Sequence, residues 1–362
     1  MTIFPRAVLA LLLLVCAAPA RAQRRPLNYR RRKKQSEAAK AAEPPSLLGK
    51  TWSPEARAAV RRFVEVRGSS SPVYNADAPP AAALALDGAA FFGDPAEAVF
   101  HKLVVEAEFR FSDDFWKQVP LGYGRQKIRA AHEQFSGLPK SLWPTQPAYH
   151  QFRKFFLASY QETCRKVGRK ECRGYLAKLL IGFTEEEARE YAKAALAEET
   201  AVAPALDREG ESDVDPAPVF WPRGLAVVPE FAQLVGALRA NGVDVWAAAP
   251  EPQAILVEAA ALAGVDASRC LGIKQGSERS RYDGNLREPL PIRGGAVDAV
   301  VSALGRPPDL VLAARLEDLP LLEYTAGVRL VLDVREAELR RRAKLDGAVL
   351  QPLFAVLLTK RR

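Results

Sequence analysis

Two aspartates and an arginine are the side chains of this sequence best placed to do chemistry. Asp87 comes directly after the apolar residues 82–86, and the Asp-Gly pair at that point is typical of a turn after a buried strand. A carboxylate at such a strand end can attack phosphorus or bind Mg²⁺. Position 85 would point the same way, because alternate strand residues share a direction, but it carries alanine. Arg315 and Asp318 follow a later apolar run. The sequence therefore suggests a phosphoryl-transfer site with an incomplete set of groups.

Strands and helices alternate around these residues. The expected strands cover 82–88, 243–250, 270–275, 309–315 and 328–334, and the expected helices cover 52–66, 94–109, 229–242, 252–264, 294–306 and 316–327. Residues 281–286 (RYDGNL) predict a hairpin. Alternation of this kind predicts an α/β fold with a doubly wound, mostly parallel sheet.

A helical region interrupts this pattern after the first strand. Between residues 110 and 200, aromatic and basic residues recur at helical spacing, and Thr184 with Glu187 fits a capping box. The acidic, proline-rich residues 201–218 predict a loop. We therefore expect an all-helical cap domain inserted into the core. The predicted boundaries are 51–100 and 216–345 for the core, 101–215 for the cap, and 346–362 for a C-terminal strand and tail.

Four short motifs on this scaffold resemble those of the haloacid dehalogenase (HAD)-like superfamily, in its phosphoserine-phosphatase-like branch. The resemblance covers about residues 80–335. The first family motif, Asp-x-Asp-x-Thr and then Gly-Asp-x-Gly-Glu-Ala, falls on ALDGA and then GDPAEA. The attacking aspartate of the family is here Ala85, its proton-donating aspartate is Asp87, and its threonine is Ala89.

The other motif positions also carry alanine. The hydroxyl that binds phosphoryl oxygens falls on Ala249 in RANGVDVWAAAPEPQ, and the helical lysine falls on Ala296 in RGGAVDAV. The metal-binding aspartate of Gly-Asp-Ser-x-x-Asp falls on Ala314, whereas the last aspartate of that motif is kept as Asp318. The resemblance implies a Rossmann-like core with a helical cap and, in active members, Mg²⁺-dependent hydrolysis of phosphomonoesters.

These losses predict a protein without that chemistry. Alanine offers no nucleophile, no metal ligand and no charge for the transition state. We therefore expect no catalytic residue, metal or cofactor, and a pseudophosphatase that binds an unknown ligand or protein. Two alternatives stay open: an active hydrolase of a small phosphomonoester that uses Mg²⁺, or a protein that binds anionic surfaces through its N-terminal segment.

Arg315 replaces a small residue where the family holds its metal. A guanidinium there would neutralise Asp87 and Asp318 in place of Mg²⁺. The alternative is that the side chain of Arg315 points into solvent.

The first 22 residues are typical of a secretory signal, with Arg6 before a short apolar core and a small-residue cleavage site before Gln23. Basic residues follow at once, which favours cytoplasmic retention, so a membrane anchor is the alternative to a periplasmic or secreted protein. Residues 1–22 contribute +2 and residues 23–40 contribute +7 to the net charge of +9, so the rest is near neutral and no specific nucleic-acid binding is expected. Residues 23–50 predict a disordered leader. An anionic surface would bind to the basic side chains of this leader, which are Arg24, Arg25, Arg30, Arg31, Arg32, Lys33 and Lys34.

The cysteines allow one short bridge. Cys164 and Cys172 flank the basic stretch RKVGRKE, and either a disulfide or two free thiols would suit them. Cys270 lies in an apolar strand context and is expected to be a core thiol. No Cys/His spacing predicts a zinc site. The histidines are scattered along the sequence, at His101, His132 and His150.

Overall fold

A seven-stranded sheet organises the protein, and the computed structural model describes residues 47–168, 172–210, 217–333 and 336–354. The strand order is β11-β10-β9-β1-β6-β7-β8, and neighbouring strands pair in parallel except for the antiparallel pair β7–β8. This confirms the predicted α/β fold with a mostly parallel sheet. The strands are β1 (Ala81–Ala85), β6 (Asp244–Pro252), β7 (Cys270–Glu278), β8 (Arg281–Arg287), β9 (Leu310–Ala313), β10 (Val328–Asp333) and β11 (Val349–Pro352).

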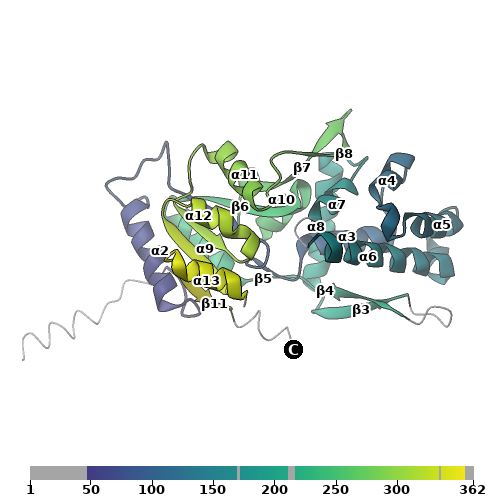
Figure 1. Ribbon diagram of the computed structural model, residues 1–362, viewed down its shortest axis with the longest axis horizontal. Coiled ribbons are helices and arrows are strands. Elements are labelled where there is room, and N and C mark those ends of the chain that lie inside the picture. Colours follow the sequence, from purple (N-terminus) through teal and green to yellow (C-terminus); the bar gives the residue numbers. More distant parts are fainter. Residues whose placement is uncertain (1–46, 169–171, 211–216, 334–335, 355–362) are drawn as a thin grey trace, which may run out of the picture. The chain divides into compact units, whose positions relative to one another are not determined.

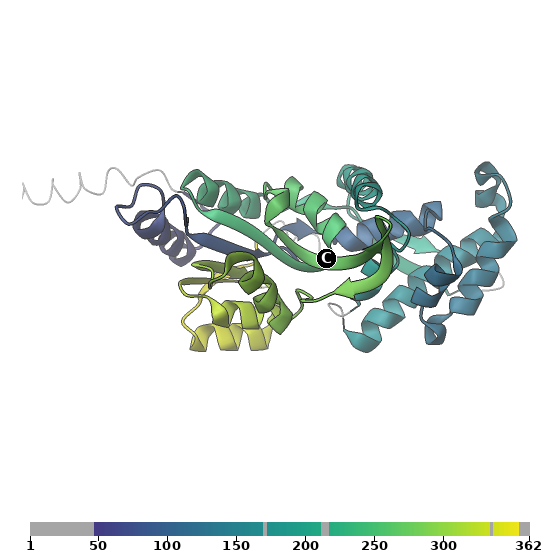
Figure 2. The ribbon, with the colours of Figure 1, turned by 90° about the horizontal axis from the view of Figure 1, so that it is seen from above.

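Helices cover both faces of this sheet, as Figure 2 shows. Leu84 packs into one buried cluster with Phe231 and Leu256, whereas its neighbour Ala83 packs into another with Val300. Both faces of β1 are therefore buried, which explains why this strand is a continuous apolar run. The first face is covered by α2 (Pro54–Arg67), α9 (Pro229–Ala240) and α10 (Gln253–Leu262), and the second by α11 (Gly294–Leu304), α12 (Leu319–Tyr324) and α13 (Ala337–Leu345).

The chain leaves the sheet after β1 and returns before α9 through two short paired strands. These strands are β2 (Phe91–Phe92) and β5 (Ala226–Val227), and they run antiparallel. The two connections between the sheet and the insertion therefore lie outside the predicted cap limits of 101–215. The inserted helices are α3 (Pro95–Glu106), α4 (Asp113–Gln118), α5 (Arg125–Phe135), α6 (Pro147–Val167), α7 (Arg173–Lys178) and α8 (Glu185–Ala201).

The insertion is not all-helical, because it ends in the hairpin β3 (Ala205–Glu209) and β4 (Val219–Arg223) (Figure 1). The prediction of a loop over 201–218 is wrong for β3. The hairpin forms because Trp221 buries its indole against Phe100 and Tyr160 of the helices, which offsets the polar composition of the two strands. Figure 1 shows β3 and β4 beside α6, which both strands contact.

The expected hairpin near the end of the sheet also differs in detail. Its turn lies at Arg279 and Ser280, which both have positive φ values, 50° and 64°. The sequence RYDGNL is instead part of β8, and its Gly284 adopts a φ of 79° within the strand. The Asp-Gly pair thus marks a local irregularity of a strand.

Several predictions fall on residues that the structure does not describe. These are the signal peptide at 1–22, the leader up to residue 46 with its basic side chains, and residues 355–362 of the C-terminal tail. Among the described helices, none combines the length and the hydrophobicity that crossing a lipid bilayer requires.

Candidate functional site

The strand register brings most of the predicted motif positions to one edge of the sheet. Ala85 is the last residue of β1 and pairs with Ala248, so Ala249 lies at the next position of β6. Leu84 of β1 and Leu312 of β9 are also paired, and Ala314 follows two residues later. Ala89 lies in the turn after β1, and Ala296 lies in the first turn of α11. All five motif alanines are buried, namely Ala85, Ala89, Ala249, Ala296 and Ala314.

Arg315 packs against the turn that follows β1. Gly88 has a φ of 78°, and a side-chain carbon at this position would lie only 2.7 Å from Arg315 Nε. The Nη2 atom of Arg315 lies 3.8 Å from Oδ1 of Asp87, and Nη1 lies 3.7 Å from Oε1 of Glu336. The structure thus brings Arg315 and Asp87 together, with a guanidinium packed on the backbone of Gly88.

Asp318 holds the turn after β9. Its Oδ2 accepts hydrogen bonds from the backbone N–H groups of Ala314, at 3.0 Å, and Arg315, at 2.8 Å. Glu336 supports the same turn, because its Oε2 accepts from the N–H of Leu316 at 2.7 Å. Sequence reasoning missed Glu336, since it precedes α13 and no motif of the resemblance includes it. These carboxylates fix the backbone that carries Arg315.

A second polar cluster joins the insertion to the sheet. Arg173 of α7 is fully buried and its guanidinium makes two hydrogen bonds with the carboxylate of Asp94, one of them at 2.8 Å. Glu251 of β6 lies 3.6 Å from Arg173 Nη1, and Glu97 of α3 lies 3.8 Å from Nη2. Burial opposes the charge of Arg173, but the carboxylates of Asp94 and Glu251 outweigh it and raise the pKa of Arg173 well above its usual value.

The two cysteines of the insertion form a disulfide that leads into this cluster. Cys164 near the end of α6 is bonded to Cys172, and Arg173 is the next residue. The bridge therefore holds α6 close to the start of α7, where the buried guanidinium is anchored. Cys270 is a buried free thiol, and burial raises its pKa to about 12.

A pocket of about 460 Å³ opens next to the buried Arg173 cluster. Its lining includes Asp94 and Glu97 from the start of α3, Glu199 from α8 and Arg223 from β4. Glu199 accepts hydrogen bonds from Arg223 Nε, at 2.6 Å, and from the N–H of Gly224, at 2.8 Å. The pocket therefore combines these charged groups with apolar lining residues such as Leu206 and Pro222, and lies where the insertion meets β2.

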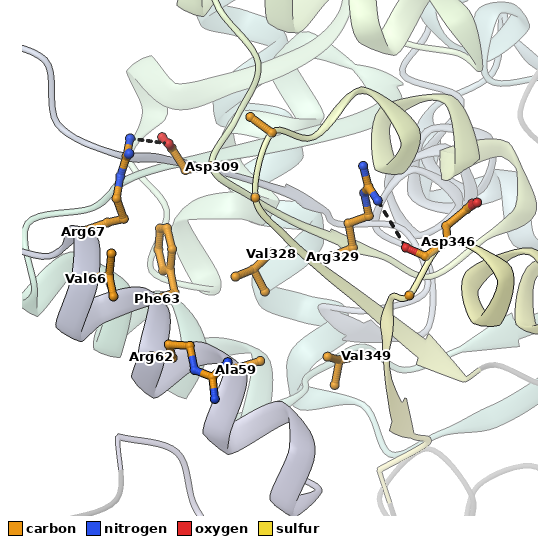
Figure 3. Close-up of a pocket in the computed structure, with 13 residues that line it drawn as sticks. Ala59, Arg62, Phe63, Val66, Arg67, Asp309, Val328, Arg329, Asp346 and Val349 are labelled. Carbon is orange, nitrogen blue, oxygen red and sulfur yellow. Dashed lines mark hydrogen bonds and ion pairs between the residues drawn. The ribbon is translucent and has the colours of Figure 1, made fainter.

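A larger pocket of about 560 Å³ lies at the opposite edge of the sheet, between α2 and the beginnings of β10 and β11 (Figure 3). Arg67 lies at its rim and pairs with Asp309 at 2.7 Å. Arg329 donates to the backbone carbonyl of Asp346 at 3.2 Å. This pocket is remote from the motif positions, which follow the carboxyl ends of the strands.

Comparisons with known proteins support the fold and do not identify a chemical activity. No protein-family model matches the sequence, and no curated protein gives a significant match. A conserved, functionally unknown protein from Anaerococcus prevotii has a similar structure, with a TM-score of 0.73, 16% identity, and coverage of 85% of this chain and 94% of its own. This similarity shows that the same fold extends over most of the chain.

Two further structures align with much lower scores. A HAD family hydrolase from Salmonella enterica serovar Typhi aligns with a TM-score of 0.36 and 10% identity, over 72% of this chain and 66% of its own. Cytosolic 5′-nucleotidase IIIB bound to cytidine aligns with a TM-score of 0.42 and 9% identity, over 87% of this chain and 93% of its own. The parallel sheet with helices on both faces makes this a Rossmann-like α/β protein with a large insertion after its first strand.

Proposed function

We propose that this protein is a HAD-like phosphatase homologue that has lost phosphoryl transfer and acts as a binding module. The observation that carries the proposal is the guanidinium of Arg315, packed on Gly88 beside Asp87 and Glu336. It lies next to the strand ends at which the resemblance puts a metal ion and a phosphoryl group.

The residues at this edge do not fit Mg²⁺. Mg²⁺ requires near-octahedral oxygen ligands, mostly carboxylates and water, and the two motif carboxylates are replaced by the buried Ala85 and Ala314. A guanidinium already supplies positive charge there, so a second cation would be repelled. Asp87 remains, but its carboxylate faces Arg315 at 3.8 Å, and a nucleophile in that position would attack without a metal to shield the phosphate.

The pocket of about 460 Å³ beside the Arg173 cluster is the proposed ligand site. It lies where the insertion joins the sheet, and such junctions commonly hold small ligands. Its lining carries the carboxylates of Asp94, Glu97 and Glu199. Arg223 pairs with Glu199, and Arg173 behind the lining pairs with Asp94, so three carboxylates stand against two guanidinium groups, which favours a ligand with a positively charged group.

A phosphatase assay with an aryl phosphate and Mg²⁺, together with calorimetric Mg²⁺ titration, tests the loss of chemistry. We expect no turnover above the buffer rate and no heat of Mg²⁺ binding, for the wild type and for Asp87→Asn alike. The matched control is Asp114→Asn, at an exposed position on α4. Turnover that disappears in Asp87→Asn and persists in Asp114→Asn would overturn the proposal in favour of an active hydrolase.

We also propose that the protein is exported, on the basis of the signal-like residues 1–22. Mass spectrometry of the chain expressed in full should then find a mature N-terminus at Gln23. An intact N-terminus in the membrane fraction would instead favour the anchored alternative. Deletion of residues 24–40 followed by sedimentation with anionic vesicles tests the surface-binding alternative, whose signature is salt-sensitive binding that the deletion abolishes.

A further inference from the structure

The insertion brings one histidine close to two carboxylates that lie far from it in the sequence. His101 lies on α3, and Asp207 and Glu209 lie on β3. Their potential ligand atoms all lie within 4.8 Å of one another. We propose that these three residues bind one divalent transition-metal ion, with Zn²⁺ as the preferred ion, and that the ion fastens the hairpin to α3.

The geometry suits such an ion with a small adjustment. The Nε2 atom of His101 lies 3.9 Å from Oε1 of Glu209. Zn²⁺ binds imidazole nitrogen and carboxylate oxygen at about 2.0–2.2 Å, so an ion fits between atoms that are about 3–4 Å apart. One nitrogen and two oxygens match the ligand types that Zn²⁺ accepts, and a water molecule can complete a tetrahedron.

The histidine gives an independent indication of a missing partner. Its side chain is only 4% exposed, and Nε2 has no hydrogen-bond partner among the described residues. The ring is held in place by stacking on Trp221, with centroids 6.0 Å apart and planes 17° from parallel. Buried polar atoms are normally satisfied, and a metal ion would satisfy this one.

Two arginines also touch the cluster, and they are compatible with an ion. Arg153 bonds to Glu209, and Arg223 Nη1 bonds to Oδ2 of Asp207 at 2.6 Å. Carboxylates that bind metals are commonly hydrogen-bonded in turn, because this orients them. Glu199 also pairs with Arg223, so the ion pairs of this group join three carboxylates to two guanidinium groups. Asp207 is 38% exposed, which leaves a path to solvent.

The test is metal titration of the full chain after chelator treatment and dialysis. Zn²⁺ binding is followed by calorimetry, and Co²⁺ binding is followed by its visible absorption, which reports coordination by protein ligands directly. We expect one site per chain, a Co²⁺ spectrum of low coordination number, and a melting temperature that Zn²⁺ raises. His101→Ala and Asp207→Asn should each weaken Zn²⁺ binding at least tenfold.

His150→Ala is the matched control, since His150 is exposed on α6 and should leave binding unchanged. Circular dichroism shows whether both variants fold. If His101→Ala does not fold, Asp207→Asn alone tests the metal site, because Asp207 is partly exposed and its substitution should be tolerated. Absence of stoichiometric binding by the wild type would overturn the proposal, as would wild-type affinity in the folded variants.

Discussion

At the level of single residues, the charge of Arg315 balances the carboxylates of Asp87 and Glu336 at the carboxyl edge of the sheet. Arg315→Ala should therefore lower the free energy of unfolding by about 1–3 kcal/mol, because it leaves two carboxylates without their cation. Urea unfolding of the variant and of the wild type measures this loss.

Arg341→Ala provides the comparison for this variant. Arg341 is an exposed residue of α13 whose ion pair with Glu338 lies at the surface, where solvent screens it, so its loss should change stability much less than the loss of Arg315. Equal stability of Arg315→Ala and the wild type would show that the guanidinium does not stabilise the carboxylates of Asp87 and Glu336.

His132 gives the insertion a pH-dependent stability. Burial among aromatic rings, the nearest being Phe111 at 3.8 Å between centroids, lowers the pKa of His132 from 6.5 to about 4, against a weak opposing effect of Glu133. Between pH 6.5 and 4 the unfolded chain binds a proton that the folded chain excludes, so stability is full above pH 6.5 and falls as the pH decreases through this window.

We expect this single group to contribute about 2 kcal/mol over the window, after allowance for its partial exposure. His132→Phe should flatten the dependence of the melting temperature on pH between 4 and 6.5, and the exposed His150→Phe should not. An unchanged slope in His132→Phe would contradict the assignment.

The site residues differ in how far the sequence could identify them. Asp87, Asp318 and the motif alanines were located through the family resemblance, whose motifs follow the strand ends. Glu336 and the buried Arg173 could not, since their partners are separated from them by long stretches of sequence and meet only in the folded chain. For the same reason the histidine of α3 gave no sign of its carboxylate neighbours.

At the level of elements, the disulfide between Cys164 and Cys172 fixes the junction of α6 and α7. The double variant Cys164→Ser/Cys172→Ser should lose about 2–3 kcal/mol of stability, as expected for a short closed loop. Urea unfolding of the wild type in reductant should reproduce the variant, whereas the variant should not respond to reductant. Equal midpoints for the oxidised wild type and the variant would contradict this role.

The elements that the sequence predicted best are those with strong periodicity. The buried strands and the helices around them lie close to their expected places, because an apolar run or a helical stripe is a local signal. The hairpin β3–β4 was missed because β3 alternates weakly and is mostly exposed, and β4 contains Pro222. Its stability comes from Trp221, which packs on helices distant in sequence.

At the level of the whole molecule, α2, the first described helix, and β11, the last described strand, are joined by direct contacts. The side chain of Gln351 is buried, accepts from the N–H of Ser53 at 2.7 Å, and donates to the carbonyl of Thr51 at 3.3 Å. Phe354 packs edge-on against Trp52, with ring centroids 5.0 Å apart. These contacts join the edge strand β11 to the start of α2.

Gln351→Ala should therefore lower stability by about 1–2 kcal/mol, since it removes the hydrogen-bond partner of the partly buried N–H of Ser53. Native-state hydrogen exchange should show faster exchange in the first turn of α2 and in β11, with little change in β1. Gln161→Ala, which removes an exposed hydrogen bond to the carbonyl of Phe220, should leave the exchange of both segments unchanged. Uniform acceleration across the sheet would instead show that β11 unfolds only with the whole protein.

The contact between Trp52 and Phe354 has a practical consequence for engineering. A circular permutant in which a few glycines and serines connect residue 354 to residue 47 needs no rearrangement of the sheet, because the spliced segments already touch. The new termini of such a permutant could be placed at the exposed Gly137, between α5 and the following turn. Domains fused to these termini would then be attached to the insertion, and the carboxyl edge of the sheet would stay intact.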